Sequence, residues 1–207
     1  MFTAFITSLR ETFEASIIVS IILAYLSGTH AAKQKVYIWI GVAMGVVVSF
    51  LLAYFFSIYF GGLEGKKEAL FEGVTSLLAA GFIVWMIIWM IYRSKNLRKH
   101  IQDQTKAVID DGYLFGLTTL AFISVAREGI EVVLFLQPLI FETEQYKIAG
   151  GVLSGALVAC VIAYLFYKGI LKFSLKLFFD VTTVFLAIFA MWLMFTGLHE
   201  ISELMEL

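Results

Sequence analysis

The sequence is poor in charged residues, has one cysteine and shows no excess of basic side chains. Charged residues make up 15% of the 207 positions, whereas soluble domains approach about a quarter, so a soluble globular protein is not expected. The lone Cys160 excludes an internal disulfide framework and a thiolate metal site within one chain. A net charge of −1 gives no basis for nucleic-acid binding.

Apolar residues dominate the chain instead, at 61% of positions and a mean hydropathy of +0.92. A helix needs about 20 apolar residues to cross a bilayer, and strands would leave backbone groups unsatisfied in lipid. The sequence therefore predicts an all-α, polytopic membrane protein with six transmembrane helices and the lipid bilayer as its surroundings. These helices are expected at about residues 2–27, 36–60, 69–92, 112–140, 148–171 and 177–198.

Lysine and arginine are unevenly distributed between the expected connections. The connections after the first, third and fifth segments carry ten of them, and the opposite side carries three. Cytoplasmic loops are enriched in basic residues. We therefore expect the odd-numbered connections to be cytoplasmic and both termini to lie outside a cell membrane, whether plasma or inner.

Three segments of the first half return in the same order in the second half. Such a three-helix unit enters the membrane from opposite faces in its two copies, which predicts two inverted repeats with a site near the midplane. We expect residues 1–92 to form the first repeat, 93–111 a cytoplasmic connector and 112–207 the second repeat. The matching pairs are residues 10–14 and 127–131 (Arg-Glu-Thr-Phe-Glu and Arg-Glu-Gly-Ile-Glu), 41–54 and 151–164 (each Gly-x-x-x-Gly followed by Ala-Tyr), and 71–75 and 179–183 (Phe-Glu-Gly-Val-Thr and Phe-Asp-Val-Thr-Thr).

The first matching pair places six charged residues inside predicted membrane helices, where each costs roughly 2.5 to 3.5 kcal/mol on insertion scales. Each motif has two acids for one base, and the surplus negative charge favours a bound cation. Carboxylate oxygens without Cys or paired His prefer hard cations such as Fe(III), Mg²⁺, Mn²⁺ or Ca²⁺. The alternative is that the arginines and glutamates only neutralise each other. The six residues are Arg10, Glu11, Glu14, Arg127, Glu128 and Glu131.

Further acidic residues lie nearer the ends of the helices. Glu72 and Asp180 match across the repeats and could extend a carboxylate ladder toward opposite faces, although an acid near a helix N-terminus is also favoured by the helix dipole. His199, Glu200 and Glu203 could capture metal at the outer surface, or could be a polar helix end. The repeated Gly-x-x-x-Gly pairs are interpreted as close helix packing.

The two Arg-Glu-x-x-Glu motifs and the run Gly197-Leu198-His199-Glu200 resemble the high-affinity iron permeases of the oxidase-dependent iron transporter family. The resemblance covers essentially the whole chain. It implies uptake of iron, Fe(III) in that family, as a transported substrate without a cofactor. It also places the four motif glutamates on the iron path and makes the two arginines their organisers.

The resemblance further implies a partner ferroxidase or an extracytoplasmic protein that supplies iron. Members of that family generally have a seventh helix, and this chain stops at Leu207 soon after the sixth, so we expect a short member or a truncated chain. A homo-oligomer is compatible with the sequence.

Two other functions remain open: a transporter of another divalent cation, such as lead or manganese, and a metal-binding membrane subunit without flux of its own. An enzyme is not expected, because no Ser-His, Cys-His or His-rich motif lies in the predicted membrane segments.

Overall fold

All regular structure in the described part of the chain is helical, which confirms the predicted all-α class. The computed structural model describes residues 1–28, 34–60, 66–93, 105, 114–168 and 175–206. Most of the predicted connector 93–111 therefore lies outside the described residues. The helices are α1 (Phe2–Gly28), α2 (Lys35–Phe60), α3 (Lys66–Arg93), α5 (Leu114–Leu136), α6 (Leu139–Glu142), α7 (Gln145–Tyr167) and α8 (Leu175–Glu206).

The fourth predicted segment, 112–140, is not one continuous helix. It ends at Leu136, and a turn containing Gln137 and Pro138 separates it from the four-residue α6. Proline lacks the backbone N–H of a helical residue, and its ring clashes with the preceding turn. The sequence contains a single proline, and its position explains why the helix ends four residues earlier than expected.

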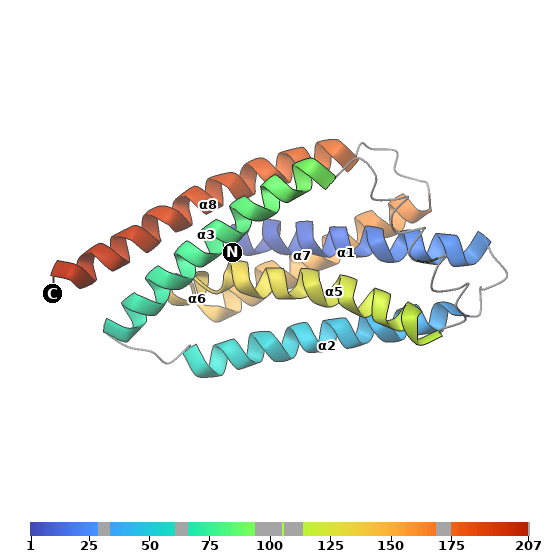
Figure 1. Cartoon of the computed structure of the whole chain (residues 1–207), viewed down its shortest axis with the longest axis horizontal. Helices are drawn as coiled ribbons and strands as arrows, with labels where there is room; N and C mark the ends of the chain where they lie inside the picture. Colours follow the sequence, from blue (N-terminus) through green and yellow to red (C-terminus); the bar gives the residue numbers. More distant parts are fainter. Residues whose placement is uncertain (29–33, 61–65, 94–104, 106–113, 169–174, 207) are drawn as a thin grey trace.

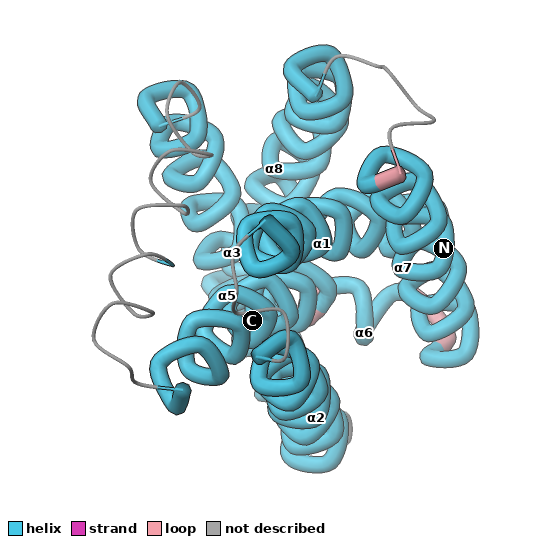
Figure 2. Tube along the Cα trace, turned by 90° about the vertical axis from the view of Figure 1, so that its right-hand side faces the viewer, coloured by secondary structure: helices cyan, strands magenta, loops and turns pink. Residues whose placement is uncertain are grey.

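The six long helices alternate in direction along the long axis of the bundle, as the colour gradient in Figure 1 makes visible. Three packed pairs dominate: α1 with α7, α2 with α5, and α3 with α8. The central contact between these pairs is made by α1 and α5, which run antiparallel (Figure 1). Figure 2 shows α1 at the middle of the bundle with the other long helices around it.

Close helix packing occurs at the predicted glycine pairs. A Cβ on Gly41 would collide with the Thr118 carbonyl oxygen of α5 and lie 2.9 Å from the Ala121 Cβ. A Cβ on Gly151 would lie 2.6 Å from the Met1 carbonyl oxygen and 2.9 Å from the Ala4 Cβ of α1. The interpretation of these glycines as packing positions is confirmed, since any side chain would force the helices apart.

The outer surface of the bundle is apolar. Large hydrophobic side chains such as Phe50, Leu78, Phe115 and Phe195 are each more than 60% exposed. Among the described residues, four helices, α2, α3, α7 and α8, are long and apolar enough to cross a membrane. The other two long helices, α1 and α5, carry the Arg-Glu motifs and turn most of those charges inward.

Candidate metal site

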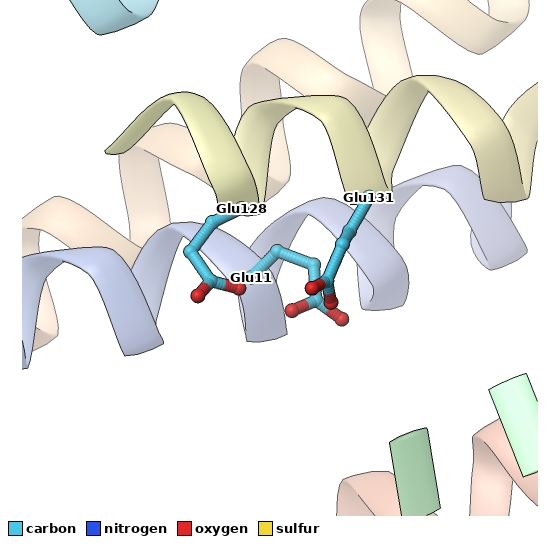
Figure 3. Close-up of side chains that lie close together, drawn as sticks. All are labelled: Glu11, Glu128 and Glu131. Atoms are coloured by element: carbon cyan, nitrogen blue, oxygen red, sulfur yellow. The ribbon is translucent and has the colours of Figure 1, made fainter. Parts of the chain in front are cut away.

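The two Arg-Glu-x-x-Glu motifs meet where α1 and α5 cross at the centre of the bundle. Glu11 of α1 and Glu128 and Glu131 of α5 each offer one carboxylate oxygen, and these three oxygens lie within 4.8 Å of one another (Figure 3). Their exposed fractions are 0%, 3% and 4%. Three acidic groups from two distant parts of the sequence thus share one buried location.

Helix geometry explains how a single helix supplies two of these carboxylates. Residues three apart on an α-helix lie on the same side, about one turn from each other. Glu128 and Glu131 have this spacing and both face α1, where the antiparallel course of the two helices brings Glu11 between them (Figure 3). Each motif is therefore positioned by ordinary helix periodicity.

The first motif is enclosed. The Arg10 guanidinium, 0% exposed, forms an ion pair and hydrogen bond with Glu11. Its Nη2 lies 3.9 Å from a Glu14 oxygen, and its Nη1 donates a 3.3 Å hydrogen bond to the Met86 sulfur of α3. Arg10 thus connects the glutamates of α1 with a helix that carries neither motif.

The second motif is more open. Arg127 Nε donates a 2.9 Å hydrogen bond to Glu131 Oε1 and lies 3.9 Å from Glu128 Oε1. Unlike Arg10, the Arg127 side chain is 41% exposed. It borders an open groove of about 600 Å³, whose other lining includes Phe82 and Trp85 of α3.

The unused oxygens of the cluster are what a cation could bind. In the described part of the chain, Oε2 of each of the three glutamates is buried and has no hydrogen-bond partner. Buried polar atoms without a partner call for an explanation such as an ion. Metal–oxygen distances of about 2.0 to 2.6 Å put opposite ligands of one ion about 4 to 5 Å apart, which matches the 4.8 Å spread of the cluster.

The other predicted metal residues are not part of this cluster. Glu14 remains one turn along α1 and interacts electrostatically with Arg127 and Glu131. Glu72 is buried on α3, where the adjacent Gly73 packs against the turn of α8 that contains Gly197 and Glu200. Asp180 is exposed near the other end of α8.

The proposed outer capture residues lie at the far end of α8. His199 is exposed and Glu200 is partly buried. The side chain of Glu203 lies outside the described residues. Through the packing of α3 on α8, Glu72 and this end of α8 occupy one end of the bundle.

Sequence reasoning missed two side chains that shape the site. Met86 accepts a hydrogen bond from Arg10, and Ser49 of α2 packs so closely on Gly129 that a Cβ there would overlap its hydroxyl. Met86 had an available signal, because Met194 occupies the corresponding position of the second repeat, at the same offset as Glu72 and Asp180. Ser49 had none, since nothing in its surrounding sequence marks it.

Comparisons with known proteins gave a consistent result. The model of the iron permease FTR1 family matches residues 1–207. An uncharacterized protein of Archaeoglobus fulgidus is 34% identical over 97% of this chain and 70% of its own length. Proteins named ferrous iron permease EfeU are 31% identical in Escherichia coli O157:H7, over 90% of this chain and 68% of theirs, and 30% identical in Yersinia pestis, over 90% and 67%. No solved structure matches.

Proposed function

The chain belongs to the iron permease FTR1 family, and we propose that it passes iron across the membrane through the cluster of Glu11, Glu128 and Glu131. Permeases of this family are integral membrane transporters, not enzymes, and iron is their substrate. The observation that carries the proposal is the convergence of three buried carboxylates, each with one oxygen that has no partner among the described residues.

The chemistry of the cluster suits transient binding. An ion entering this buried location loses hydration water, and carboxylate oxygens from both helices replace it. Arg10 and Arg127 already engage Glu11 and Glu131, so the ion competes with two internal cations for the carboxylates. Such competition limits affinity, and transport requires an ion to leave as well as to bind.

The oxidation state of the iron is a second part of the proposal. The resemblance to oxidase-dependent transporters points to Fe(III), and the hard oxygen ligands are compatible with it. Charge balance favours Fe(II): four motif glutamates and two motif arginines carry a net charge of −2 when all are ionised. A divalent ion neutralises this set, and a buried site carries the smallest electrostatic penalty when its net charge is zero. The relatives in Escherichia coli and Yersinia pestis are named ferrous iron permeases.

We propose that the chain spans the membrane six times as two inverted three-helix repeats, residues 1–92 and 112–207, with both termini outside. Support comes from matched packing: α1 pairs with α7 as α5 pairs with α2, and the glycine contacts correspond. Adding 117 to Met1, Ala4 and Phe5, the residues near Gly151, gives the residues near Gly41, which are Thr118, Ala121 and Phe122.

The remaining predicted residues have roles along the path on either side of the cluster. We propose that Glu72 with His199, Glu200 and Glu203 receives iron at the outer end, supplied by a ferroxidase or another extracytoplasmic protein. Glu14, next to the cluster, and Asp180, toward the inner end, continue the path. Glu144 is a carboxylate that we place outside the path. It forms an ion pair with Lys147, and this interaction lowers the pKa of Glu144.

The test is iron flux into liposomes that contain this chain alone, with Fe(II) held reduced by ascorbate and Fe(III) supplied as citrate. We expect uptake well above that of empty liposomes, faster with Fe(II) if charge balance governs selectivity. Binding without flux would support the alternative of a metal-binding subunit. Equal uptake of Mn²⁺ or Pb²⁺ would favour the broader divalent transporter.

Variants of the cluster test its role directly. Glu11→Gln, Glu128→Gln and Glu131→Gln should each reduce uptake by at least about tenfold, because even the outer partners of metal ligands are worth about 10- to 100-fold. Glu14→Gln should have a smaller effect, since Glu14 lies outside the cluster. The matched control is Glu144→Gln, an exposed carboxylate outside the path, which should transport normally. Normal uptake in all three cluster variants would exclude this site.

A further inference from the structure

Five side chains outside the two motifs have a buried polar atom without a hydrogen-bond partner among the described residues, and two of them, Gln34 and Thr183, are only partly buried as whole residues. The other three are almost completely buried. They are the Thr7 hydroxyl of α1, the Ser76 hydroxyl of α3 and the amide of Gln137, which follows α5. Thr7 and Ser76 are 0% exposed and Gln137 is 3% exposed. Native proteins rarely leave such groups dry, because an unpaired buried hydroxyl or amide costs free energy that water or an ion can recover.

All three residues border one apolar cluster. Ala4 of α1, Ala79 and Ala80 of α3, and Leu136 next to Gln137 belong to that cluster. Thr7 follows Ala4 by three residues, and Ser76 precedes Ala79 by three, so each lies on the face of its helix that turns toward the cluster. Two helices and the turn after α5 therefore place polar groups beside one region of the interior.

Their positions form a series from the glutamate cluster toward one end of the bundle. At a rise of 1.5 Å per residue, Thr7 lies about 6 Å from the level of Glu11 and Gln137 about 9 Å from that of Glu131. Ser76 lies about 15 Å along α3 from Met86, which contacts Arg10. The alternating helix directions place all three on the same side of the cluster (Figure 1).

The series ends at the pole of the bundle where Glu72 is buried. Glu72 is one helical turn beyond Ser76 on α3 and packs near the far end of α8. A groove of about 520 Å³ also reaches Thr7 from this end, between α1, α6 and α8, with Leu139 and Phe189 in its walls. Glu72 and the groove both lie at this end of the bundle, so the three polar side chains lie between the surface at this end and the glutamate cluster.

We propose that Thr7, Ser76 and Gln137 line a hydrated passage that conducts iron between Glu72 and the glutamate cluster. Their neutral oxygens replace part of the hydration shell of a passing cation without holding it as a carboxylate would. This assignment rests on the proposed function for its cargo, but the presence of water in the passage can be tested without transport.

The corresponding positions of the second repeat differ. Thr7 corresponds to Ser124, whose hydroxyl donates a 2.8 Å hydrogen bond to the Leu120 carbonyl of its own helix. Ser76 corresponds to Val184, which is 59% exposed. Neither counterpart is therefore a buried hydroxyl without a partner, and Ser124 provides a matched control whose hydroxyl is already satisfied.

Water access is tested by cysteine labelling of the full chain in liposomes. Thr7→Cys and Ser76→Cys are made in a Cys160→Ala background, treated with 2-(trimethylammonium)ethyl methanethiosulfonate, and followed by mass. We expect both to be labelled and iron to slow the reaction. Leu78→Cys, at an apolar and exposed position of α3, should react slowly. Labelling of the two passage positions no faster than Leu78→Cys would overturn the proposal.

A second experiment separates transport from folding. Thr7→Val and Ser76→Ala remove buried unpaired hydroxyls, so thermal stability in detergent should hold or rise. Iron uptake should fall about two- to tenfold, because each variant removes one oxygen contact with the ion, of a strength similar to a hydrogen bond. Ser124→Ala should leave uptake unchanged. Unchanged uptake in Thr7→Val and Ser76→Ala, or parallel loss of stability and uptake, would contradict the passage. If the unaltered chain passes no iron but Thr7→Cys and Ser76→Cys are labelled, the permease function fails and the water-filled passage stands.

Discussion

The two Arg-Glu-x-x-Glu motifs have the same pattern but different surroundings. Arg10 is fully enclosed and contacts the Met86 sulfur, whereas the Arg127 side chain is 41% exposed at the edge of a groove. Around them the packing is closely matched, since Gly41 approaches α5 as Gly151 approaches α1. The two matched segments thus agree where helices touch and differ at the charged centre.

The different surroundings of Arg10 and Arg127 predict that removal of each arginine has a different cost in stability. A fully buried charge depends on its partners, because removing one leaves the other uncompensated in a medium of low dielectric constant. A charge that borders an open groove has fewer protein atoms around it, and where water reaches the groove its ion pairs contribute less. Variants made in pairs, one at each of two matched positions, measure the energetic consequence of this difference.

The largest difference is expected between Arg10→Ala and Arg127→Ala. Arg10→Ala leaves Glu11 buried without its base, which should cost about 3 to 5 kcal/mol of stability and reduce the amount of inserted protein. Arg127→Ala should cost less than half as much. Thermal unfolding in detergent and the abundance of membrane-inserted protein measure both effects.

The lysine variants serve as controls for charge. Arg10→Lys should restore insertion better than iron uptake, because lysine keeps the charge but lacks the planar guanidinium that contacts Glu11, Glu14 and Met86 together. Equal losses of stability for the two alanine variants would mean that the exposure of Arg127 has no energetic consequence.

The matched glycines should respond equally. Gly41→Val and Gly151→Val each insert a side chain against the backbone of a neighbouring helix, and such overpacking costs about 1 to 3 kcal/mol. Gly150→Ala is the control, because its Cβ would meet only the Met1 methyl carbon, at 4.0 Å. Its thermal midpoint should hold or rise. A large loss at only one of the two matched positions would argue against equivalent repeats.

At position 129 the two motifs differ in side-chain size, and the neighbouring packing differs with it. The first motif has Thr12 where the second has Gly129, and a Cβ on Gly129 would overlap the Ser49 hydroxyl. We expect Gly129→Ala to cost about 1 kcal/mol, at the lower end of overpacking. Adding Ser49→Gly should recover most of it, because the obstructing atoms belong to that side chain. A double variant no more stable than Gly129→Ala would show that the contact with Ser49 is not the reason for glycine at position 129.

The sequence predicted the helical class and the central location of the charged motifs because both follow from simple periodicities. Apolar segments long enough to span a bilayer appear directly as runs of residues, and spacing of three places Glu128 beside Glu131. The meeting of these residues with Glu11 was expected from the repeat. In the described structure, Glu11, Glu128 and Glu131 form the cluster and Glu14 does not.

Other features could not be predicted because they depend on the rotation of each helix about its axis. Periodicity places Arg10 and Arg127 identically, yet one is enclosed and the other borders a groove. The same holds for Glu72 and Asp180, which match in sequence and differ in burial. The break at Pro138 was visible as a residue, but its effect on α5 was not anticipated.

The smallest expected difference concerns two methionines at matching positions, Met86 and Met194. Met86 is 3% exposed and accepts a hydrogen bond from Arg10, whereas Met194 is 46% exposed. A thioether is a weak acceptor, and Leu has nearly the volume of Met, so Met86→Leu should lower stability by about 0.5 to 1 kcal/mol. Met194→Leu should leave the thermal midpoint unchanged. Iron uptake by Met86→Leu should fall in proportion to the displacement of Arg10, since the sulfur accepts a hydrogen bond from the same Nη1 that pairs with Glu11. If both variants behave like the unaltered chain, Arg10 is positioned by its carboxylates alone, and the contact with α3 adds nothing to the enclosure of the first motif.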